Sequence, residues 1–534
     1  MHVHQALARA LHDNGVRHLF GVLGDANLHV VNDFGELPGS CYVAVASEGG
    51  AVLAALGYAQ VSGRLGVATA THGPGLTNTI TGLVEAERAR VPLLLIAGDT
   101  PASAHDHIQD IDQRPLALAA GARFVPVRSG ASAVSDLATA IRAARTERIP
   151  VVLNLPIDLL GEQVEYRPVN AEATAAEAPE PEAAAVEDAV GVIASAKRPL
   201  VLAGRGVATS GAAARVSELA ARIGAPVATT LRGKDLFAGH RHNLGIFGSL
   251  SDEFATEVIS RADCVVALGC GLNPWTTAEG ALLRGKGVVH VDTDPGRLNR
   301  FTPATVSVAG DASAAASAFI RLLDAAEVAP TRFADEVSSR LASRPPPRVT
   351  DRGTDTSVDI RTALRRIDEA VPANRVVVTD NGRFILTAFT ALHVEHPRLY
   401  AHAVNFGAIG LGMSTALGAS YAEPDRPVLA AIGDGGFALG GLSDLVTAVM
   451  QRRRIVIALL NDGAYGAEYV QLRNRGMDPS VAVLPWPDFG PIARAIGAQG
   501  HTVHNLKELD AALEEIDFEA GPVLLDVRLD PDHV

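Results

Sequence analysis

The sequence contains few cysteines and no long basic segment, and each shortage excludes a class of protein. Three cysteines, Cys41, Cys264 and Cys270, stand among 534 residues, without the spacing of a disulfide framework or a zinc site. Because all three lie in apolar contexts, we expect small core residues in a reducing compartment. The longest basic run is Arg452-Arg453-Arg454 and the formal net charge is −14. This balance argues against a nucleic acid as a partner.

Long apolar segments are also missing. No run of about 18 apolar residues predicts a membrane span. The first segment, MHVHQALARALHDNGV, has the pattern of an amphipathic helix and lacks the apolar centre of a signal peptide. We therefore expect a cytoplasmic protein without a membrane partner.

The chain does have length and apolar content. At about 100–200 residues per domain, its length predicts about three domains, and its composition of 48% hydrophobic and 20% charged residues is typical of a globular protein. Two segments, 171–187 and 328–356, have the composition of linkers because they are rich in alanine, glutamate or proline. They predict domains at 1–170, 188–325 and 357–534.

Apolar runs of strand length alternate with helical patterns in all three segments. The runs are Leu19–Leu23, Cys41–Ala46, Gly66–Ala70, Pro92–Ala97, Val151–Leu155, Leu200–Ala203, Pro226–Thr229, Cys264–Leu268, Val288–Asp292, Arg375–Thr379, Pro427–Ile432, Ile455–Leu460 and Val523–Val527. Strands that alternate with helices predict parallel sheets covered by helices on both faces. The predicted fold class is therefore α/β, with three doubly wound parallel-sheet domains.

Two polar clusters follow neighbouring strands of the third segment. Gly433-Asp434-Gly435-Gly436 follows one apolar run and Asn461-Asp462-Gly463 follows the next, with a helical pattern over Leu442–Gln451 between them. Both clusters should meet at the carboxyl edge of one sheet, where doubly wound folds bind ligands. Glycines there let backbone N–H groups approach a phosphate. Because Asp434 would repel that phosphate, a cation is needed between them, and Mg²⁺ accepts both carboxylate and phosphate oxygens.

These clusters resemble the thiamine diphosphate motif, in which Gly-Asp-Gly is followed after about 25 residues by two asparagines. The chain therefore resembles the thiamine diphosphate enzymes of the pyruvate decarboxylase, benzoylformate decarboxylase and acetolactate synthase type. The resemblance implies an N-terminal pyrimidine-binding domain, a middle domain and a C-terminal diphosphate-binding domain. It also implies a homodimer or homotetramer, because the cofactor of such enzymes lies between the N-terminal domain of one subunit and the C-terminal domain of another.

The second metal ligand has two candidates. The family's second asparagine binds the metal, and alignment on Tyr465-Gly466 places Asp462 at that position, with the carbonyl of Ala464 as the backbone ligand. This alignment requires one extra residue within Leu439–Ser443. A strict count from Asp434 makes Asn461 the ligand instead.

The resemblance implies further cofactor contacts. Glu48 begins a helix and matches the catalytic glutamate that hydrogen-bonds the aminopyrimidine ring. Its neighbours offer no charge partner, so we expect a buried, unpaired carboxylate that exchanges a proton near neutrality. Ile409 matches the aliphatic residue that supports the bent cofactor, and the carbonyl of Gly407 accepts its amino group. The other matched positions are Pro74, Asn78, Asn381, Gly382, Arg383, Gly433, Asp434, Gly435, Gly436, Asp462, Ala464, Tyr465 and Gly466.

Three residues are candidates for the substrate pocket, and two of them, both acids, favour decarboxylation. Asp25, in Gly24-Asp25-Ala26-Asn27, and Glu468, six residues after Asp462, resemble the pocket acids of decarboxylases. One acid could disfavour the substrate carboxylate while the other supplies a proton. His72 begins the Gly-Pro-Gly loop and could hydrogen-bond a substrate carboxylate or carbonyl.

Gly73–Asn78 and Gln109 favour the synthase branch, and hence carboligation. His105 and His107 only partly resemble the adjacent histidine pair of decarboxylases, whereas Gln109 matches the synthase glutamine. A synthase would often bind FAD in its middle domain, where Gly204-Arg205-Gly206 forms part of a dinucleotide fingerprint without its third glycine.

The sequence thus predicts a thiamine diphosphate- and Mg²⁺-dependent decarboxylation of a 2-oxo acid, with or without carboligation to a second carbonyl. One alternative is an acetolactate synthase-like carboligase, with FAD left open. Another is a non-catalytic homologue that binds a nucleotide or partners, against which the presence of Glu48 and Asp434 argues.

Overall fold

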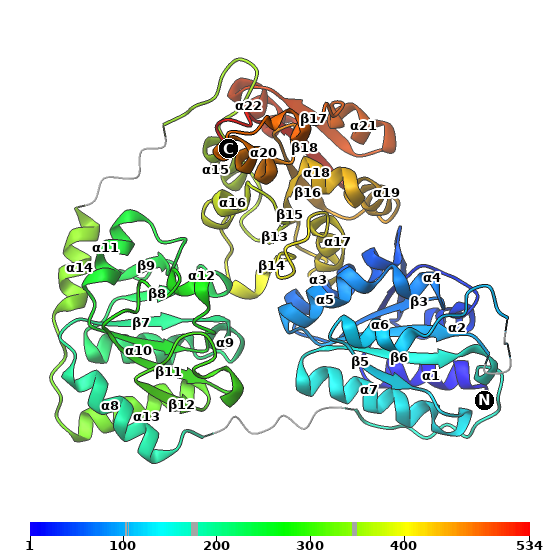
Figure 1. Cartoon of the computed structure of the whole chain (residues 1–534), viewed down its shortest axis with the longest axis horizontal. Coiled ribbons are helices and arrows are strands. Elements are labelled where there is room, and N and C mark those ends of the chain that lie inside the picture. Colours follow the sequence, from blue (N-terminus) through cyan, green and yellow to red (C-terminus); the bar gives the residue numbers. More distant parts are fainter. Residues whose placement is uncertain (102–103, 105, 172–179, 344–349) are drawn as a thin grey trace. The chain divides into compact units, whose positions relative to one another are not determined.

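The computed structural model describes residues 1–101, 104, 106–171, 180–343 and 350–534 (Figure 1). These residues form three six-stranded sheets in which every paired strand is parallel to its neighbour. One compact unit comprises Met1–Thr174, Thr350–Leu392 and Leu399–Val534, and contains the first and third sheets. Ala175–Val349 and His393–Arg398 form the second unit, which contains the middle sheet. The predicted α/β class with three parallel sheets is confirmed, whereas the exact domain boundaries stay a prediction.

The first sheet lies in the N-terminal part of the chain. Its strands, in spatial order, are β2 (Cys41–Ala44), β1 (His18–Gly21), β3 (Gly66–Ala70), β4 (Leu93–Asp99), β6 (Pro150–Pro156) and β5 (Arg123–Pro126). Its helices are α1 (Val3–Asp13), α2 (Leu28–Gly35), α3 (Glu48–Ser62), α4 (Pro74–Thr77), α5 (Ile80–Ala89), α6 (Gln113–Ala119) and α7 (Ala133–Glu147). Strands β3, β4 and β6 are buried along nearly their whole length, which explains their continuous apolar runs.

The middle sheet belongs to the second unit. Its strands, in spatial order, are β12 (Val306–Ala309), β11 (Gly287–Asp292), β10 (Cys264–Leu268), β7 (Pro199–Ala203), β8 (Val227–Thr229) and β9 (Asn243–Ile246). Its helices are α8 (Ala183–Ser195), α9 (Arg205–Thr209), α10 (Ala213–Ile223), α11 (Glu253–Arg261), α12 (Pro274–Thr277), α13 (Ala312–Ala325) and α14 (Phe333–Ala342).

The third sheet carries the two polar clusters. Its strands, in spatial order, are β14 (Tyr400–His402), β13 (Val376–Thr379), β15 (Val428–Gly433), β16 (Ile455–Asn461), β18 (Val523–Arg528) and β17 (Gln499–Val503). Its helices are α15 (Ile360–Ala370), α16 (Ile385–Ala391), α17 (Gly412–Ala422), α18 (Asp434–Gly436), the π-helix η6 (Phe437–Gly441), α19 (Leu442–Met450), α20 (Gly466–Asn474), α21 (Phe489–Ile496) and α22 (Leu506–Glu515).

The first and third sheets have the same strand order. Each places its second strand at one edge, followed by the first, third, fourth, sixth and fifth strands. In both sheets the chain runs from the first strand to the second on one side and continues with the third strand on the other side of the first. In doubly wound sheets, ligands bind outside the carboxyl ends of the strands at such a reversal of the strand order. In the third sheet the reversal lies between β13 and β15, so the loops after Thr379 and Gly433 flank it. Both predicted diphosphate loops are therefore adjacent.

Helices α3 and α17 join the first sheet to the third within one compact unit. They cross so closely that a Cβ atom at Gly57 would lie 2.0 Å from the carbonyl oxygen of Thr415. A Cβ atom at Gly418 would lie 1.8 Å from the carbonyl oxygen of Ala54. Only glycine allows this approach, so both helices are buried almost all round.

Two predictions about the chain are wrong. The proposed linker 328–356 contains helix α14, whose Phe333 and Val337 are buried in the core of the second unit. Its three buried apolar residues stand among charged residues and serines, so the helical pattern is weak in the sequence. Cys41 is exposed rather than a core residue, because it lies on the edge strand β2, while Cys264 and Cys270 are buried as expected. In the described part of the chain, no helix is long and apolar enough to cross a membrane.

Candidate active site

A buried carboxylate stands at the carboxyl edge of the third sheet. Strand β15 ends at Gly433, and Asp434 begins the helical turn α18 with its side chain almost fully buried. Its Oδ2 atom has no hydrogen-bond partner among the described residues. Burial, and then the charge of Asp462, raise the pKa of Asp434 to about 7. Backbone hydrogen bonds from Gly435 and Gly463 act in the opposite direction. A buried carboxylate oxygen without a partner is unfavourable unless a cation or a proton neutralises the acid.

Asp462 faces the same region from the end of strand β16. Its Oδ1 accepts the backbone N–H of Ala464 at 3.2 Å. Burial raises the pKa of Asp462 to about 6, opposed by this N–H and by the charge of Arg383. A Cβ atom at Gly466 would lie 2.3 Å from Asp462 Oδ2, so a glycine is needed beside this carboxylate. Two neighbouring carboxylates, one buried and one partly buried, both with a raised pKa, fit a hard divalent cation.

Asn461 uses both ends of its amide within the fold. Its Nδ2 donates to Asp526 Oδ1 at 2.7 Å, and its Oδ1 accepts the backbone N–H of Gly463 at 3.1 Å. The side chain is only 1% exposed. The Asn461 side chain therefore links β16 to β18. In the described residues, no cluster of three or more histidine, cysteine or acidic side chains could hold a metal. Backbone or ligand oxygens would have to complete a coordination sphere.

The π-helix η6 accounts for the spacing between the two clusters. The alignment that places Asp462 at the metal position requires one extra residue within Leu439–Ser443. Residues Phe437–Gly441 form a π-helical turn, whose i→i+5 hydrogen bonds enclose one more residue than an α-helical turn. The structure thus has a place for that extra residue.

Glycines open the backbone beside Asp434. A Cβ atom at Gly435 would lie 2.9 Å from the ring of Tyr465 and 3.9 Å from Ile409 Cδ1. One at Gly436 would lie 2.9 Å from the backbone nitrogen of Gly410. The structure therefore brings Ile409, Tyr465 and the glycine turn together, as the sequence predicts.

The loop after β13 contains a buried acid that sequence reasoning missed. Asp380 is fully buried and accepts the backbone N–H groups of Asn381, Gly410 and Leu411 at 2.8, 3.0 and 3.2 Å. Burial raises the pKa of Asp380 to about 6, opposed by these hydrogen bonds. Asn381 Nδ2 donates to the carbonyl of Gly407 at 2.7 Å. Only one lone pair of the Gly407 carbonyl is therefore left for a ligand.

Glu48 lies at the carboxyl edge of the first sheet, and its environment differs from the expectation. It is the first residue of α3, after Ser47, whose side chain accepts the backbone N–H of Gly50 at 3.0 Å. The carboxylate is only partly buried, and its Oε2 accepts Asn78 Nδ2 at 3.0 Å. The prediction of a buried, unpaired acid is wrong for the single chain, because the start of α3 reaches the surface and Asn78 follows the short helix α4.

His72 is the buried polar residue of this edge. It is 1% exposed, its Nδ1 lies 3.2 Å from Thr71 Oγ1, and its Nε2 has no partner among the described residues. Its ring centroid lies 4.9 Å from that of His107. Burial, and then the charge of His107, lower the pKa of His72, whereas Asp25 and Asp99 act in the opposite direction. His72 is therefore a neutral donor or acceptor near neutral pH.

The other pocket candidates are divided between the two edges. Asp25 is exposed near His72, and the Gln109 carbonyl oxygen lies 2.2 Å from the position of a Cβ atom at Gly73. Pro74 is the first residue of α4. Glu468 is exposed in the first turn of α20, at the third sheet. The structure thus groups Asp25 with His72 and His107 but places Glu468 at another sheet edge, while His105 lies outside the described residues.

Three family models match successive parts of the chain. The N-terminal TPP binding domain of the thiamine pyrophosphate enzymes matches residues 1–116, the central domain 186–319 and the C-terminal TPP binding domain 380–527. The chain belongs to the thiamine pyrophosphate enzyme family. The predicted family membership is confirmed.

The curated relatives of the chain include acetolactate synthases and sulfoacetaldehyde acetyltransferases. An acetolactate synthase of Mycobacterium bovis is 30% identical over 423 residues, covering 78% of this chain and 68% of the relative. A sulfoacetaldehyde acetyltransferase of Roseovarius nubinhibens is 28% identical over 446 residues, covering 78% and 73%. An acetolactate synthase of Arthrospira platensis is 32% identical over 324 residues, covering 57% and 55%.

In this thiamine pyrophosphate enzyme the two glycines after β7 have a packing role. A Cβ atom at Gly204 would lie 2.2 Å from the carbonyl oxygen of Gly269, and one at Gly206 would lie 2.7 Å from Gly269 Cα. The loops after β7 and β10 are therefore in contact. This contact accounts for both glycines without a bound nucleotide.

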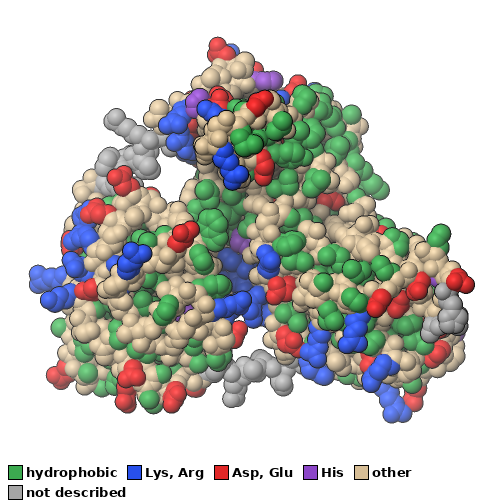
Figure 2. All heavy atoms as spheres, viewed as in Figure 1, with side chains coloured by type: hydrophobic (Ala, Val, Ile, Leu, Met, Phe, Trp, Pro, Cys, Tyr) green, Lys and Arg blue, Asp and Glu red, His purple; other side chains and the backbone are tan. Residues whose placement is uncertain are grey.

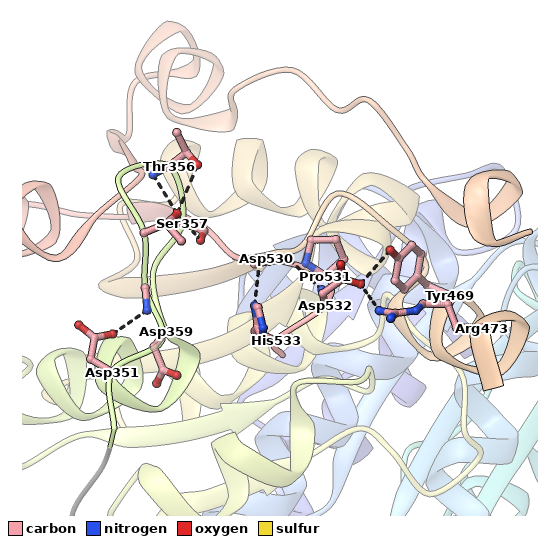
Figure 3. A network of polar contacts seen from close by, with 12 residues as sticks. Asp351, Thr356, Ser357, Asp359, Tyr469, Arg473, Asp530, Pro531, Asp532 and His533 are labelled. Carbon is pink, nitrogen blue, oxygen red and sulfur yellow. Dashed lines mark hydrogen bonds and ion pairs between the residues drawn. The ribbon is translucent and has the colours of Figure 1, made fainter.

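The last residues of the chain lie against α20 (Figure 3). Asp532 accepts the hydroxyl of Tyr469 at 3.0 Å and forms an ion pair with Arg473. Arg383 donates to the carbonyl of Pro531. Arg383, predicted to contact a diphosphate, thus links the loop after β13 to the segment that follows β18.

Proposed function

We propose that this protein uses thiamine diphosphate and Mg²⁺ to decarboxylate a 2-oxo acid and transfers the remaining fragment to a second carbonyl compound. The observation that carries the proposal is the pair of neighbouring carboxylates at the carboxyl edge of the third sheet, the buried Asp434 after β15 and the partly buried Asp462 after β16. Their raised pKa values and the unpartnered Oδ2 of Asp434 support a cation between them and a diphosphate.

We assign the metal to Asp434, Asp462 and the carbonyl of Ala464. Asp462 is preferred over Asn461 because the amide of Asn461 is hydrogen-bonded at both ends within the fold. The π-helical turn η6 supports the same alignment, since it holds the extra residue that the alignment requires. The diphosphate would lie on the backbone of Gly433–Gly436, near the loop Asn381–Arg383.

The bound cofactor would supply a carbon nucleophile and take up the electron pair that CO₂ leaves behind. The chain's own groups would do the rest. Glu48 would hydrogen-bond the aminopyrimidine ring and hold a proton there. Ile409 would support the bend of the cofactor, and the free lone pair of the Gly407 carbonyl would orient its amino group.

The transfer step is supported by the names of the relatives. One is named as an acetolactate synthase and the other as an acetyltransferase for sulfoacetaldehyde. His72, as a buried neutral donor beside His107, would hydrogen-bond a carbonyl or carboxylate oxygen of a substrate. Simple decarboxylation is the second candidate, because the acids Asp25 and Glu468 match those of decarboxylases. The proposal does not require FAD.

We further propose that the catalytic unit is a homodimer or homotetramer with its active sites between subunits. The partly exposed Glu48 supports this, because its carboxylate needs a cofactor-bearing surface opposite it. Leu439, Val446 and Met450 on η6 and α19 are 69%, 38% and 79% exposed. Figure 2 shows hydrophobic side chains gathered on one side of the C-terminal part. A second copy of the chain would cover them.

The proposal is tested with purified protein, thiamine diphosphate, Mg²⁺ and a panel of 2-oxo acids, each with and without an aldehyde or a second 2-oxo acid. We expect CO₂ release that needs both the cofactor and the metal, and a coupled product that forms only with the correct acceptor. CO₂ release with only the simple aldehyde as product would favour the decarboxylase. No CO₂ from any 2-oxo acid would refute the proposal. Light scattering would show whether the 55.5 kDa chain forms a dimer or a tetramer.

A further inference from the structure

One fully buried carboxylate of the N-terminal part holds the loop that carries Ile409. Glu85, on helix α5, is 0% exposed. Its Oε1 accepts the backbone N–H and the side-chain Nδ2 of Asn405 at 3.1 and 2.7 Å. Its Oε2 accepts the backbone N–H of Phe406 at 2.7 Å. Both carboxylate oxygens of Glu85 thus accept hydrogen bonds from two successive residues of a loop that lies more than 300 positions further along the chain.

The same loop is held on its other side by Asp380. That carboxylate accepts the backbone N–H groups of Gly410 and Leu411, and Asn381 donates to the carbonyl of Gly407. The segment from Asn405 to Leu411 is therefore hydrogen-bonded at one end to Glu85 and at the other end to Asp380. Ile409 lies between the two attachments.

Polar attachment supplements the packing of Ala408 and Leu411 against the core of the N-terminal part. Gly407 and Gly410 both have a φ of 82°, a conformation that favours glycine and leaves the backbone free to move. Hydrogen bonds to a charged acceptor are about twice as strong as neutral ones. A guanidinium of the same helix, from Arg88, lies 4.7 Å from the centroid of the Phe406 ring and adds a second contact. Helix α5 thus determines where the loop begins.

We infer that Glu85 is a positioning residue that fixes Ile409 against Gly435 and Tyr465, so that the N-terminal part of each chain sets the cofactor fit in the C-terminal part of the same chain. The inference rests on the proposed function, because Ile409 matters only if thiamine diphosphate binds there. Glu85 itself need not touch the cofactor.

The chain offers a matched control in the same interface. Gln60 on α3 binds the backbone of His402 on β14 from both ends of its amide, with its Nε2 donating to the carbonyl at 3.0 Å and its Oε1 accepting the N–H at 3.0 Å. This contact also joins the N-terminal part to the C-terminal part, but it precedes the loop. Gln60→Ala should weaken the interface without moving Ile409.

The first experiment uses the cofactor-free full chain. In Glu85→Gln, hydrogen exchange of the backbone amides of Asn405 and Phe406 should become at least about tenfold faster. The reason is that the NH₂ group of glutamine replaces a carboxylate oxygen and cannot accept a hydrogen bond from an N–H group. Asn405→Ala, which leaves the acid in place, should give a smaller change in the same direction and serves if Glu85→Gln does not fold. Gln60→Ala should leave both amides unchanged. Unchanged exchange in Glu85→Gln, or in Asn405→Ala if that variant replaces it, would overturn the inference.

The second experiment measures the dissociation constant of thiamine diphosphate with saturating Mg²⁺ by calorimetry. We expect at least about tenfold weaker binding in Glu85→Gln and less than about threefold in Gln60→Ala. Equal losses in both variants would mean a general weakening of the interface and would overturn the positioning role. If the unaltered protein does not bind thiamine diphosphate, the proposed function and the inference both fail. If it binds and Glu85→Gln binds equally well, only the inference fails.

Discussion

The first and third sheets have the same strand order but differ in what stands at their carboxyl edges. Among the described residues, the third edge holds two buried acids, Asp380 and Asp434, and the partly buried Asp462, all beside glycine-rich backbone. The first edge holds a partly exposed Glu48 and an exposed Asp25 beside the buried His72. The same topology thus carries polar groups that are mostly buried at one sheet edge and polar groups that are mostly exposed at the other.

The difference has an energetic reason. Buried acids without a cation destabilise a fold, so Asp434 and Asp462 indicate that a charged ligand belongs there. A partly exposed acid such as Glu48 keeps part of its hydration, so its charge destabilises the folded chain little and does not require a cation. Its environment in the working enzyme must therefore come from whatever covers the first edge.

The largest expected effect tests the open edge. Glu48→Gln should lower the rate constant of turnover by about 10²–10⁴-fold, the range for loss of a general acid or base, while cofactor affinity and thermal stability change little. Steady-state kinetics and calorimetry would measure both. Glu36→Gln, an exposed acid of the same part of the chain, is the control. Normal turnover in Glu48→Gln would break the comparison.

A second substitution tests the closed edge. Loss of a residue that only hydrogen-bonds a metal ligand lowers metal affinity by about 10–100-fold. Loss of a ligand should have a larger effect, so Asp434→Asn should weaken Mg²⁺-dependent cofactor binding by more than about 100-fold. The metal-free variant should melt at a higher temperature than the unaltered chain, because a buried charge is removed. Asp425→Asn, an exposed acid before β15, is the control. Cofactor binding that is as strong and as Mg²⁺-dependent as in the unaltered chain would contradict the assignment.

The contact that joins the two halves can be broken by one methyl group. Gly57→Ala should destabilise the protein by about 1–3 kcal/mol or more, because the new Cβ would meet the Thr415 carbonyl oxygen at 2.0 Å. Gly191→Ala, in helix α8 with nothing within 4 Å of the added atom, should stabilise by about 0.5–1 kcal/mol. Denaturant unfolding measures both changes, and equal stability of the two variants would count against the close helix crossing.

The pH dependence of metal binding is the finest test. Protons compete with Mg²⁺ for acids whose pKa values are about 7 and about 6. The apparent Mg²⁺ affinity should therefore fall by up to about tenfold per pH unit between about pH 7 and 6, where one proton is displaced, and by up to about a hundredfold per unit below about pH 6, where two are. Without metal, the folded chain binds these protons more tightly than the unfolded chain, so its stability should fall as the pH rises from about 4 to 7. Thermal unfolding with EDTA or Mg²⁺ at several pH values checks both. A pH-independent affinity would mean that neither acid binds the metal.

Strands in the interior of each sheet could be predicted from the sequence, whereas most edge strands could not. The apolar runs correspond to the twelve interior strands and to β2. The missed strands β5, β9, β12, β14 and β17 all lie at sheet edges. An interior strand of a parallel sheet is buried on both faces and must be apolar throughout. An edge strand is short or only partly covered, so its sequence resembles a loop.

The candidate site divides in the same way. Gly433–Gly436 and Asn461–Gly463 are local in sequence, so their chemistry could be predicted from their position after buried strands. Glu85 could not, because its partners Asn405 and Phe406 are more than 300 residues away and an isolated glutamate in a helix resembles a surface residue. Asp380 was missed because only its backbone contacts distinguish it from a turn aspartate.

The sequence by itself determined the family, the three parallel sheets and the residues of the glycine-aspartate turn, because buried strands and phosphate-binding turns need particular residue types at fixed spacings. Only the tertiary structure decided that the Asn461 amide is bound to Asp526, that Glu48 is partly exposed and that Glu85 holds the Ile409 loop. Burial and hydrogen bonding between distant segments depend on which surfaces meet, and that information is not local to any stretch of the chain.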